Sequence, residues 1–324
     1  MSKAIGRLAN LGIGKETSRG IGVSADFWVP KITLSYDDKV TKVNSALSYG
    51  TINSMGNQSL VAQKWAEGTI EGEILDKSFG LFLLALLGTV SSAVEETTAY
   101  RHTYTLQEDN QHDSLSLHID EPNGDFIFEL AMIENMEITM VPEDVVKFSV
   151  DFKSKSSQAS AGSATYTAEN KFLGRHLSFK VAALTGNLDA ASALSLKSLT
   201  VSISKSLLLD QVLGTVQPED ILNQAISISG ELELLYDDRT YANYMLDGTY
   251  RAMRIELVNS DATVGATSNP TFRLDLSRVE FESWEVAREN DDVMAQTISF
   301  KAMHDITNGN TINSCYLINE TVSY

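Results

Sequence analysis

The chain has 324 residues, of which 43% are hydrophobic, and its 43 acidic and 25 basic side chains give a net charge of -18. This composition supports one large domain or two modest ones and excludes wholesale disorder. DNA affinity comes mainly from Lys and Arg side chains that neutralise phosphates, so the acidic excess argues against a sequence-specific DNA-binding protein. A protein that DNA passes without binding remains possible.

Cysteine usage and the N-terminal sequence bear on the compartment. The single cysteine, Cys315, cannot form a disulfide within the chain, which argues against a secreted disulfide-stapled module. The N-terminus has no apolar core of signal-peptide length, and no segment reaches the roughly 20 apolar residues of a membrane span. We therefore expect a protein made in the cytoplasm, without a membrane partner.

The first half of the chain predicts one β-rich unit. Residues 1–30 are rich in glycine and predict an extended N-terminal arm, after which period-two alternation begins at Ile32. A long polar loop is predicted over residues 37–64, followed by a strand around "GTIEGEIL" and a helix that ends before Gly88. Four further alternating segments complete a first unit over residues 31–152.

The remaining chain divides into a linker, a second unit and a C-terminal segment. Residues 153–176 are rich in Ser, Ala, Thr and Gly and predict the linker. Alternating segments return over residues 177–303, and residues 304–324 form the predicted C-terminal segment.

The second unit repeats the elements of the first in the same order. Gly72 matches Gly230 within similar strands, Phe152 is matched with Phe300, and "DDRTYANYMLDG" takes the position of the helix. We infer a tandem duplication. The predicted fold class is mainly β, with two tandem sandwich or barrel units that are each flanked by one α-helix.

The helix of the first unit is too apolar for a surface helix. A helix that is hydrophobic all round, such as Phe79 to Leu87, must be covered on more than one side. Its own sheet can cover one side, which leaves a neighbouring subunit or the sister unit to cover the other. We predict an inter-subunit contact through Phe79, Phe82, Leu83 and Leu86. The second helix carries Asn243 and Asp247, so we expect it to touch water.

Two matching strands predict a small, polar and acidic sheet face. When Ile70 and Ile74 point to the core, the alternate side chains of that strand point away. The same alternation applies around Ile228 in the second unit, and neither outward face carries Lys or Arg. Taken alone, this pattern favours an ordinary solvated face, and the apolar helix behind the sheet is what favours an assembly. The predicted acidic residues are Glu71, Glu73, Asp151, Glu231 and Glu233.

Catalytic and cofactor-binding motifs are missing from the sequence. The five histidines are scattered, and none pairs with another at metal-ligand spacing. "GIGKET" lacks the first glycine of a phosphate loop, and Glu16 replaces the hydroxyl residue that would hold magnesium. We expect no enzymatic activity, no cofactor and no metal site.

The sequence resembles the major tail tube proteins of long-tailed, siphovirus-type bacteriophages over nearly its whole length. The resemblance is carried by "IGKETSRGIGVSADFWVPK", "AEGTIEGEILDKSFGLFLLALLG", "YRHTYTL", "DSLSLHID", "ATYTAENKFLGRHLSFKV" and "ISISGELELLYDD". It implies a structural subunit with a β-sandwich or barrel fold flanked by a helix. Copies of such a subunit assemble into stacked rings around a β-barrel channel, through which genomic DNA passes into the host without specific binding.

The resemblance also implies partners and contacts. Rings would stack through the arm, the long loop and the C-terminal segment, and the acidic residues would face the lumen, where they repel DNA. The partners are further copies of the chain, the tape measure protein, and the tail terminator and distal tail proteins, in a virion tail assembled in the bacterial cytoplasm. Family rings commonly contain six units, so two units per chain imply a pseudo-hexameric ring of three chains.

Three alternatives stay open at this point. The chain could be the inner tube of a contractile tail or a related secretion machine, which would need an outer surface that docks a sheath. A β-sandwich binding module would need aromatic side chains along one strand face, whereas Trp28, Trp65 and Trp284 are scattered. A β-sandwich hydrolase would need a catalytic constellation that the sequence does not show.

Overall fold

The computed structural model describes residues 3–53, 55–56, 58–288 and 293–324, and it confirms the predicted mainly β fold. The described strands are β1 (Asn10–Lys15), β2 (Phe27–Val29), β3 (Lys31–Asn44), β4 (Ser59–Glu73), β5 (Gly88–Glu96), β6 (Ala99–Leu106), β7 (Leu115–Glu121), β8 (Gly124–Met140), β9 (Lys147–Ser154), β10 (Gln158–Ser160), β11 (Leu177–Ala182), β12 (Ala193–Leu194), β13 (Ser198–Asp210), β14 (Asp220–Leu235), β15 (Arg251–Val258), β16 (Thr271–Ala287), β17 (Ala295–Met303) and β18 (Ile312–Asn319). The helices are α1 (Phe79–Leu87) and α2 (Thr240–Leu246), with 3-10 turns at Gly6–Leu8, Gly174–His176 and Thr185–Asn187.

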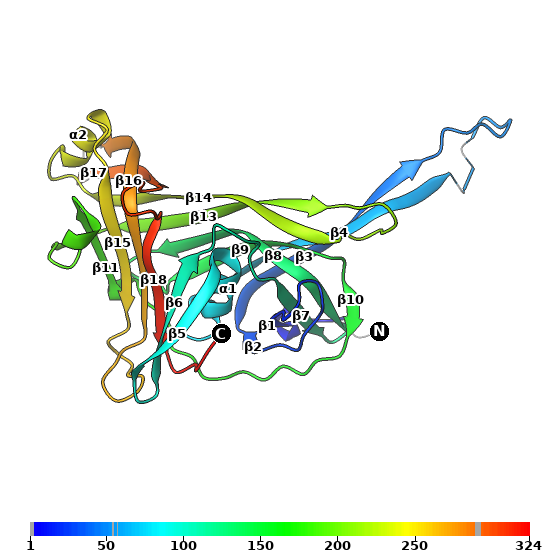
Figure 1. Cartoon of the computed structure of the whole chain (residues 1–324), viewed down its shortest axis with the longest axis horizontal. Helices are drawn as coiled ribbons and strands as arrows, with labels where there is room; N and C mark the ends of the chain where they lie inside the picture. Colours follow the sequence, from blue (N-terminus) through cyan, green and yellow to red (C-terminus); the bar gives the residue numbers. More distant parts are fainter. Residues whose placement is uncertain (1–2, 54, 57, 289–292) are drawn as a thin grey trace.

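One continuous inner sheet runs through both halves of the chain. Its strand order is β3-β4-β9-β8-β13-β14-β17-β16, and the antiparallel pairing of β8 with β13 joins the first half to the second. The sheet is open, with β3 and β16 at its two ends. Figure 1 shows α1 beside this sheet, between it and the strands of the outer layer.

Two outer sheets complete the architecture. The first has the order β2-β1-β7-β8-β10, and the second has the order β12-β11-β15-β16-β18-β6-β5. Strands β8 and β16 are each 17 residues long. They are long enough to pair in an outer sheet with their first half and in the inner sheet with their second half.

The strand pairings repeat in the two halves. Strands β1 to β4 and β7 to β10 pair with one another in the pattern that β11 to β18 follow. The hairpin β5–β6 has no counterpart in the second half, and it joins the second outer sheet through the pairing of β6 with β18. An element that belongs to the first half by sequence thus packs with the second half in space.

Two strand glycines show the repeat at atomic detail. A Cβ at Gly72 would lie 2.9 Å from the ring of Phe148, and a Cβ at Gly230 would lie 2.5 Å from the ring of Phe300. The counterpart of Gly230 is nevertheless Gly68, whose Cβ would lie 2.8 Å from the ring of Phe152, and the β-bulges follow Phe152 and Phe300 in the same way. Phe152 is therefore the counterpart of Phe300, as predicted, and the predicted match of Gly72 with Gly230 is wrong. Alternating strands look alike after a shift by an even number of residues, so the sequence pattern alone does not fix the register.

We expect alanine at either strand glycine to lower the free energy of unfolding by about 1–3 kcal/mol, because the added methyl group overlaps a buried ring. Gly230→Ala should cost more than Gly72→Ala, since its Cβ would also lie 2.4 Å from the Thr200 carbonyl oxygen. Gly186→Ala is the control, because no atom lies within 4 Å of its added Cβ. Urea unfolding of the three variants measures the difference, and equal stabilities would contradict this packing.

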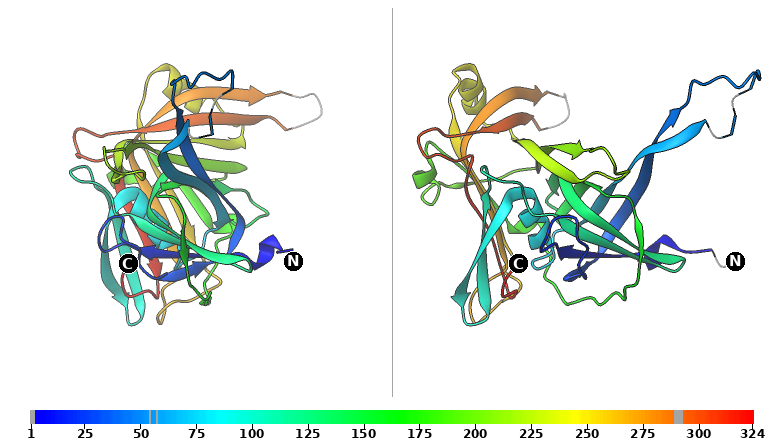
Figure 2. Two further views of the ribbon diagram at one scale, coloured as in Figure 1. Left: turned by 90° about the vertical axis from the view of Figure 1, so that its right-hand side faces the viewer. Right: turned by 45° about the vertical axis from the view of Figure 1, so that its right-hand side comes forward.

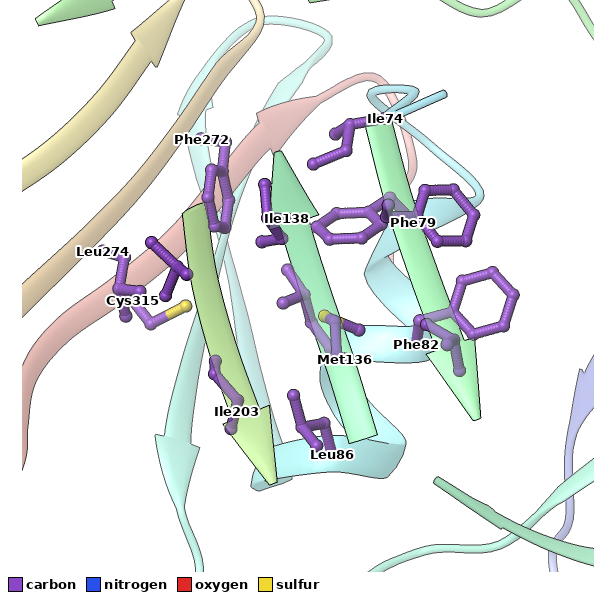
Figure 3. Close-up of a cluster of buried hydrophobic side chains, with 14 of the residues drawn as sticks. Ile74, Phe79, Phe82, Leu86, Met136, Ile138, Ile203, Phe272, Leu274 and Cys315 are labelled. Carbon is purple, nitrogen blue, oxygen red and sulfur yellow. The ribbon is translucent and has the colours of Figure 1, made fainter. Parts of the chain in front are cut away.

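Helix α1 is enclosed within one chain. Its nine residues are all buried. The ring of Phe79 packs against Phe148 of the inner sheet at 5.6 Å and against Phe272 of the second outer sheet at 5.8 Å between centroids. Figure 3 shows side chains of α1, the inner sheet and the second outer sheet gathered in this cluster.

The burial of this helix contradicts the prediction that it contacts another subunit. The sister unit of the same chain supplies the cover, so these side chains have no surface left for another subunit. The four predicted residues, each at most 1% exposed, are Phe79, Phe82, Leu83 and Leu86.

Helix α1 ends where the sequence predicts. Gly88 ends α1 with a φ of 100°, and its N–H donates to the Leu84 carbonyl. At the other end, Ser78 makes no side-chain capping bond. Instead, the carboxylate of Glu169 accepts hydrogen bonds from the backbone N–H groups of Lys77 at 3.1 Å and Ser78 at 2.6 Å. Helix α2 touches water through the exposed Asn243 and Asp247, as predicted, although its first turn is partly buried.

Segments predicted as an arm, a loop, a linker and a tail contain paired strands. Strand β1 of the predicted arm pairs with β7, and β10 of the predicted linker pairs with β8. The hairpin β3–β4 occupies most of the predicted loop, and β18 of the predicted tail pairs with β16 and β6. Strand β1 was not predicted because its glycines interrupt the period-two pattern. Gly14 is needed there, since a Cβ at this position would lie 2.3 Å from the Ser24 carbonyl oxygen. Residues 1–2, 54, 57 and 289–292 of the predicted segments lie outside the described residues.

Candidate functional site

The face of the inner sheet that is turned away from α1 is polar along its whole width. On β9, for example, Phe148 and Val150 are buried, whereas Ser149 and Asp151 turn to the other side. Ser283 and Ser299 lie on this side of β16 and β17, with their hydroxyl oxygens 2.5 Å apart. We call this surface, formed by the outward side chains of β3, β4, β9, β8, β13, β14, β17 and β16, the polar face.

All five predicted acidic residues occupy the polar face. The carboxylate of Asp151 accepts a hydrogen bond of 2.6 Å from the Thr69 hydroxyl, and that of Glu233 accepts one of 3.3 Å from the Ser198 hydroxyl. Glu71 and Glu231 are exposed. Residues that are far apart in the sequence are thus brought to one side of one sheet, namely Glu71, Glu73, Asp151, Glu231 and Glu233.

The polar face also carries lysines, which the alternation of β4 and β14 does not reveal because these lysines lie on the neighbouring strands β9 and β17. Lys153 of β9 binds Glu134 at 2.5 Å, and Lys147 of β9 binds Asp144. Lys301 lies opposite Glu280 on the adjacent strand. The period-two pattern of β9 and β17 was the signal that could have revealed them. Further carboxylates keep the face acidic, namely Asp37, Glu67, Glu137 and Glu285.

The two ends of the inner sheet have free edges. Within the described residues, β3 pairs only with β4, and residues 280–287 of β16 pair only with β17. The unpaired N–H and C=O groups of such an edge can extend the sheet into another chain. The polar face therefore ends in two strands that are able to continue it.

The hairpin β3–β4 projects beyond the rest of the protein (Figures 1 and 2). Its exposed large apolar side chains include Val43, Leu47, Tyr49, Ile52, Met55 and Leu60. An exposed apolar surface of this kind marks a site of interaction with another protein.

Residues that could suggest chemistry have structural roles. Glu16 is buried, and its carboxylate accepts hydrogen bonds from the Ser114 and Ser116 hydroxyls and from the N–H groups of Gly20 and Leu130. It therefore fastens the β1–β2 loop to the first outer sheet. Burial raises the pKa of the Cys315 thiol to about 12, which keeps the sulfur protonated.

Within the part of the chain that the structure describes, no group of three or more His, Cys, Asp or Glu residues is arranged to hold a metal ion. None of the described helices is long and apolar enough to cross a membrane.

Comparison with known proteins identifies the family of this chain. The family described as phage tail tube protein matches residues 6–302. No curated protein matches the chain at a significant level. The family match includes both halves of the inner sheet, the polar face and the projecting hairpin. The chain belongs to the phage tail tube protein family.

Proposed function

We propose that this chain is a non-enzymatic subunit of a tail tube, in which three chains close a ring and the polar face lines a channel for DNA. One observation carries the proposal: the pairing of β8 with β13 joins two equivalent halves edge to edge inside the chain. The equivalent strands β16 and β3 are the free ends of the same sheet. Repeating the internal junction between chains continues the sheet from one chain to the next.

The registers identify the residues that meet at this junction. Glu137 of β8 and Glu285 of β16 each lie two residues beyond the residue that follows the β-bulge, Asn135 or Ser283. Asp37 of β3 and Ser202 of β13 each follow the residue that pairs with the strand glycine, Gly68 or Gly230. Glu137 pairs with Ser202 inside the chain. Glu285 of one chain is therefore expected to pair with Asp37 of the next.

Cysteines at these two positions test the ring. In the variant Asp37→Cys with Glu285→Cys, oxidation of assembled protein should link chains into dimers and trimers, because directly opposed strand residues have Cβ atoms about 4.5–5.5 Å apart. Non-reducing denaturing electrophoresis counts the linked chains, and the ladder should end at three. The native Cys315 is buried and does not compete.

An internal pair provides the matched control for this test. Glu137→Cys with Ser202→Cys places the same cross-strand disulfide within one chain, so it should form without a ladder. A ladder that continues to six chains would contradict a ring of three. Assembled rings in which only the control pair oxidises would contradict the β16–β3 junction.

The composition of the polar face supports its place in a channel. Its hydroxyl and amide groups can hold water, and its excess of carboxylates repels DNA phosphates at short range. Lys153 and Lys147 are paired with carboxylates, so they offer phosphate less attraction than free lysines would. DNA moving past this surface would meet repulsion from Glu71 and Glu231, and little that binds it.

The projecting hairpin supports contacts beyond one ring. Its exposed apolar side chains would be covered by the next ring in the stack, where burial of apolar area stabilises association. The remaining partners in this proposal are the tape measure protein inside the tube, and the tail terminator and distal tail proteins at its ends. The virion tail is the site of action, after assembly in the bacterial cytoplasm.

A further inference from the structure

A groove on the second half of the chain has a counterpart on the first half that is already filled. The groove has a volume of about 790 Å³ and lies between the β11–β12 loop, the loop before β15, the middle of β16 and the segment after β17. We call it the unit-two groove, and its walls include Asn187, Tyr250, Arg251, Ser277, Arg278 and Thr307. The corresponding elements of the first half are the β1–β2 loop, the loop before β7, the middle of β8 and the segment after β9.

These four elements of the first half hold the loop end of the β13–β14 hairpin. From the β1–β2 loop, the Arg19 guanidinium donates to the Asp220 carboxylate at 2.6 Å and to the Ile221 carbonyl at 2.7 Å. From the loop before β7, the backbone N–H of His112 donates to the Asn223 side-chain oxygen at 2.9 Å. The N-terminal end of β14 is thus fixed by side-chain and backbone bonds.

The other two elements complete the filled site. Ile221 is fully buried and packs with Leu130 and Met132 from the middle of β8. From the tip of the hairpin, the Gln217 amide donates to the Ser156 hydroxyl in the segment after β9 at 2.8 Å. Every element that lines the unit-two groove therefore has a counterpart that contacts this hairpin.

We infer that the unit-two groove receives the loop end of the β3–β4 hairpin from a second copy of this chain. The pair Leu207–Asn223 after the β13–β14 bulge corresponds to the pair Lys42–Val61 after the β3–β4 bulge, so residues 220–223 correspond to residues 58–61. The inference rests on the proposed ring, because the β16–β3 junction brings the second copy's β4 to this place.

The chemistry of the two sites changes on both sides together. Where β8 presents Leu130 and Met132 to Ile221, the corresponding residues of β16 are Arg278 and Glu280, and the residue of β4 that corresponds to Ile221 is Ser59. An apolar contact inside the chain thus has a polar counterpart between chains. An interface between chains assembled from separate copies is exposed to water beforehand, which suits polar groups.

Aromatic rings hold the cations of the groove in place. The Arg278 guanidinium lies 3.9 Å from the centroid of the Tyr250 ring, and that of Arg251 lies 4.2 Å from the centroid of Tyr244. Such stacking fixes guanidinium groups with their N–H donors turned outward at the ring edge. The Ser59 hydroxyl and the backbone carbonyl groups of residues 58–61 are groups that these donors can bind.

A photoreactive side chain at Ser59 tests the contact directly. We expect benzoylphenylalanine at this position, irradiated in assembled rings, to link to peptides that contain residues 183–187, 248–251 or 305–308. Mixing chains of normal and heavy nitrogen content before assembly shows by mass spectrometry whether the link joins two chains. Links to other surfaces, or links within one chain, would overturn the inference.

A bulky side chain in the groove provides a second test. Thr307→Trp should leave the melting temperature of the unassembled chain unchanged, because Thr307 is exposed, and reduce the yield of rings at least tenfold. Ser91→Trp, on the exposed β5 strand at the other edge of the same sheet, is the control and should assemble normally. Negative-stain microscopy counts the rings. Normal rings from Thr307→Trp contradict this inference alone, whereas a wild-type chain that forms no rings contradicts the proposed function as well.

Discussion

Deletion of Tyr324, the last residue, should lower the free energy of unfolding by about 3–5 kcal/mol, the range for loss of a large aromatic side chain from a core. The ring packs against His102 at 4.6 Å and Phe27 at 6.0 Å between centroids. Its hydroxyl donates to the Lys77 carbonyl at 2.5 Å and accepts from the Asn319 amide at 2.6 Å. The C-terminal side chain is thus part of the core around α1.

The first turn of α1 is built around this ring. A Cβ at Gly80 would lie 2.3 Å from the ring of Tyr324, so only glycine lets the helix approach so closely. Burial raises the pKa of the Tyr324 hydroxyl, which keeps its proton available for the bond to Lys77. Loss of the residue would leave a cavity beside a fully buried helix.

Two variants separate the contributions of the ring and the hydroxyl. Tyr324→Phe keeps the ring and should lose only about 1–3 kcal/mol, because one buried hydrogen-bond network is left incomplete. Val322→Ala, at an exposed position, is the control and should change stability by less than about 0.5 kcal/mol. Chemical unfolding followed by tryptophan fluorescence measures all three. A deletion variant as stable as the control would mean that the C-terminus is a free tail.

Lys205→Met should stabilise the folded chain at neutral pH by about 2–4 kcal/mol. Lys205 is 2% exposed, and burial lowers the pKa of its amine from 10.5 to about 7, with a further lowering by Arg19. Each pKa unit corresponds to about 1.4 kcal/mol. At pH 7 and below, the buried lysine therefore lowers the free energy of unfolding by about 5 kcal/mol. Methionine removes this cost but leaves the Ala85 carbonyl without its donor, which returns about 1–3 kcal/mol.

The sign of the pH dependence follows from the lowered pKa. Between about pH 7 and 10.5 the unfolded lysine binds a proton that the folded lysine has released, so the stability of the wild-type chain should rise with pH in this window. Lys205→Met lacks this contribution. The difference between the two chains should therefore be largest at pH 7 and below, and should shrink and reverse towards pH 10.5.

Groups around the lysine affect the size of this effect but not its direction. Nζ of Lys205 lies 3.3 Å from Nδ1 of His112, whose own pKa is lowered by burial and by Lys205. His304 and Glu108 line the same cavity. Urea unfolding of both chains at several pH values measures the difference. A constant difference across pH 7 to 10.5 would contradict a lysine that is neutral in the folded state.

Local sequence patterns were enough to predict the features that depend on neighbouring residues along a strand or helix. Period two placed Glu71 and Glu231 on the outward face of their strands, because successive side chains of a strand point to opposite sides. The same local geometry predicted the mainly β class and the end of α1 at Gly88. The order of elements indicated the repeat without requiring any contact between the two halves.

Contacts between distant segments set what lies beside each element. They place Phe272 of the sister unit on Phe79, and they add β5 and β6 to the second outer sheet. They also identify Gly68 as the counterpart of Gly230 and pack Tyr324 into the core. These features depend on hydrogen bonds and contacts between residues far apart in the chain. Alternation repeats every two residues, so the local pattern allows several registers and partners, and packing of the whole core selects one.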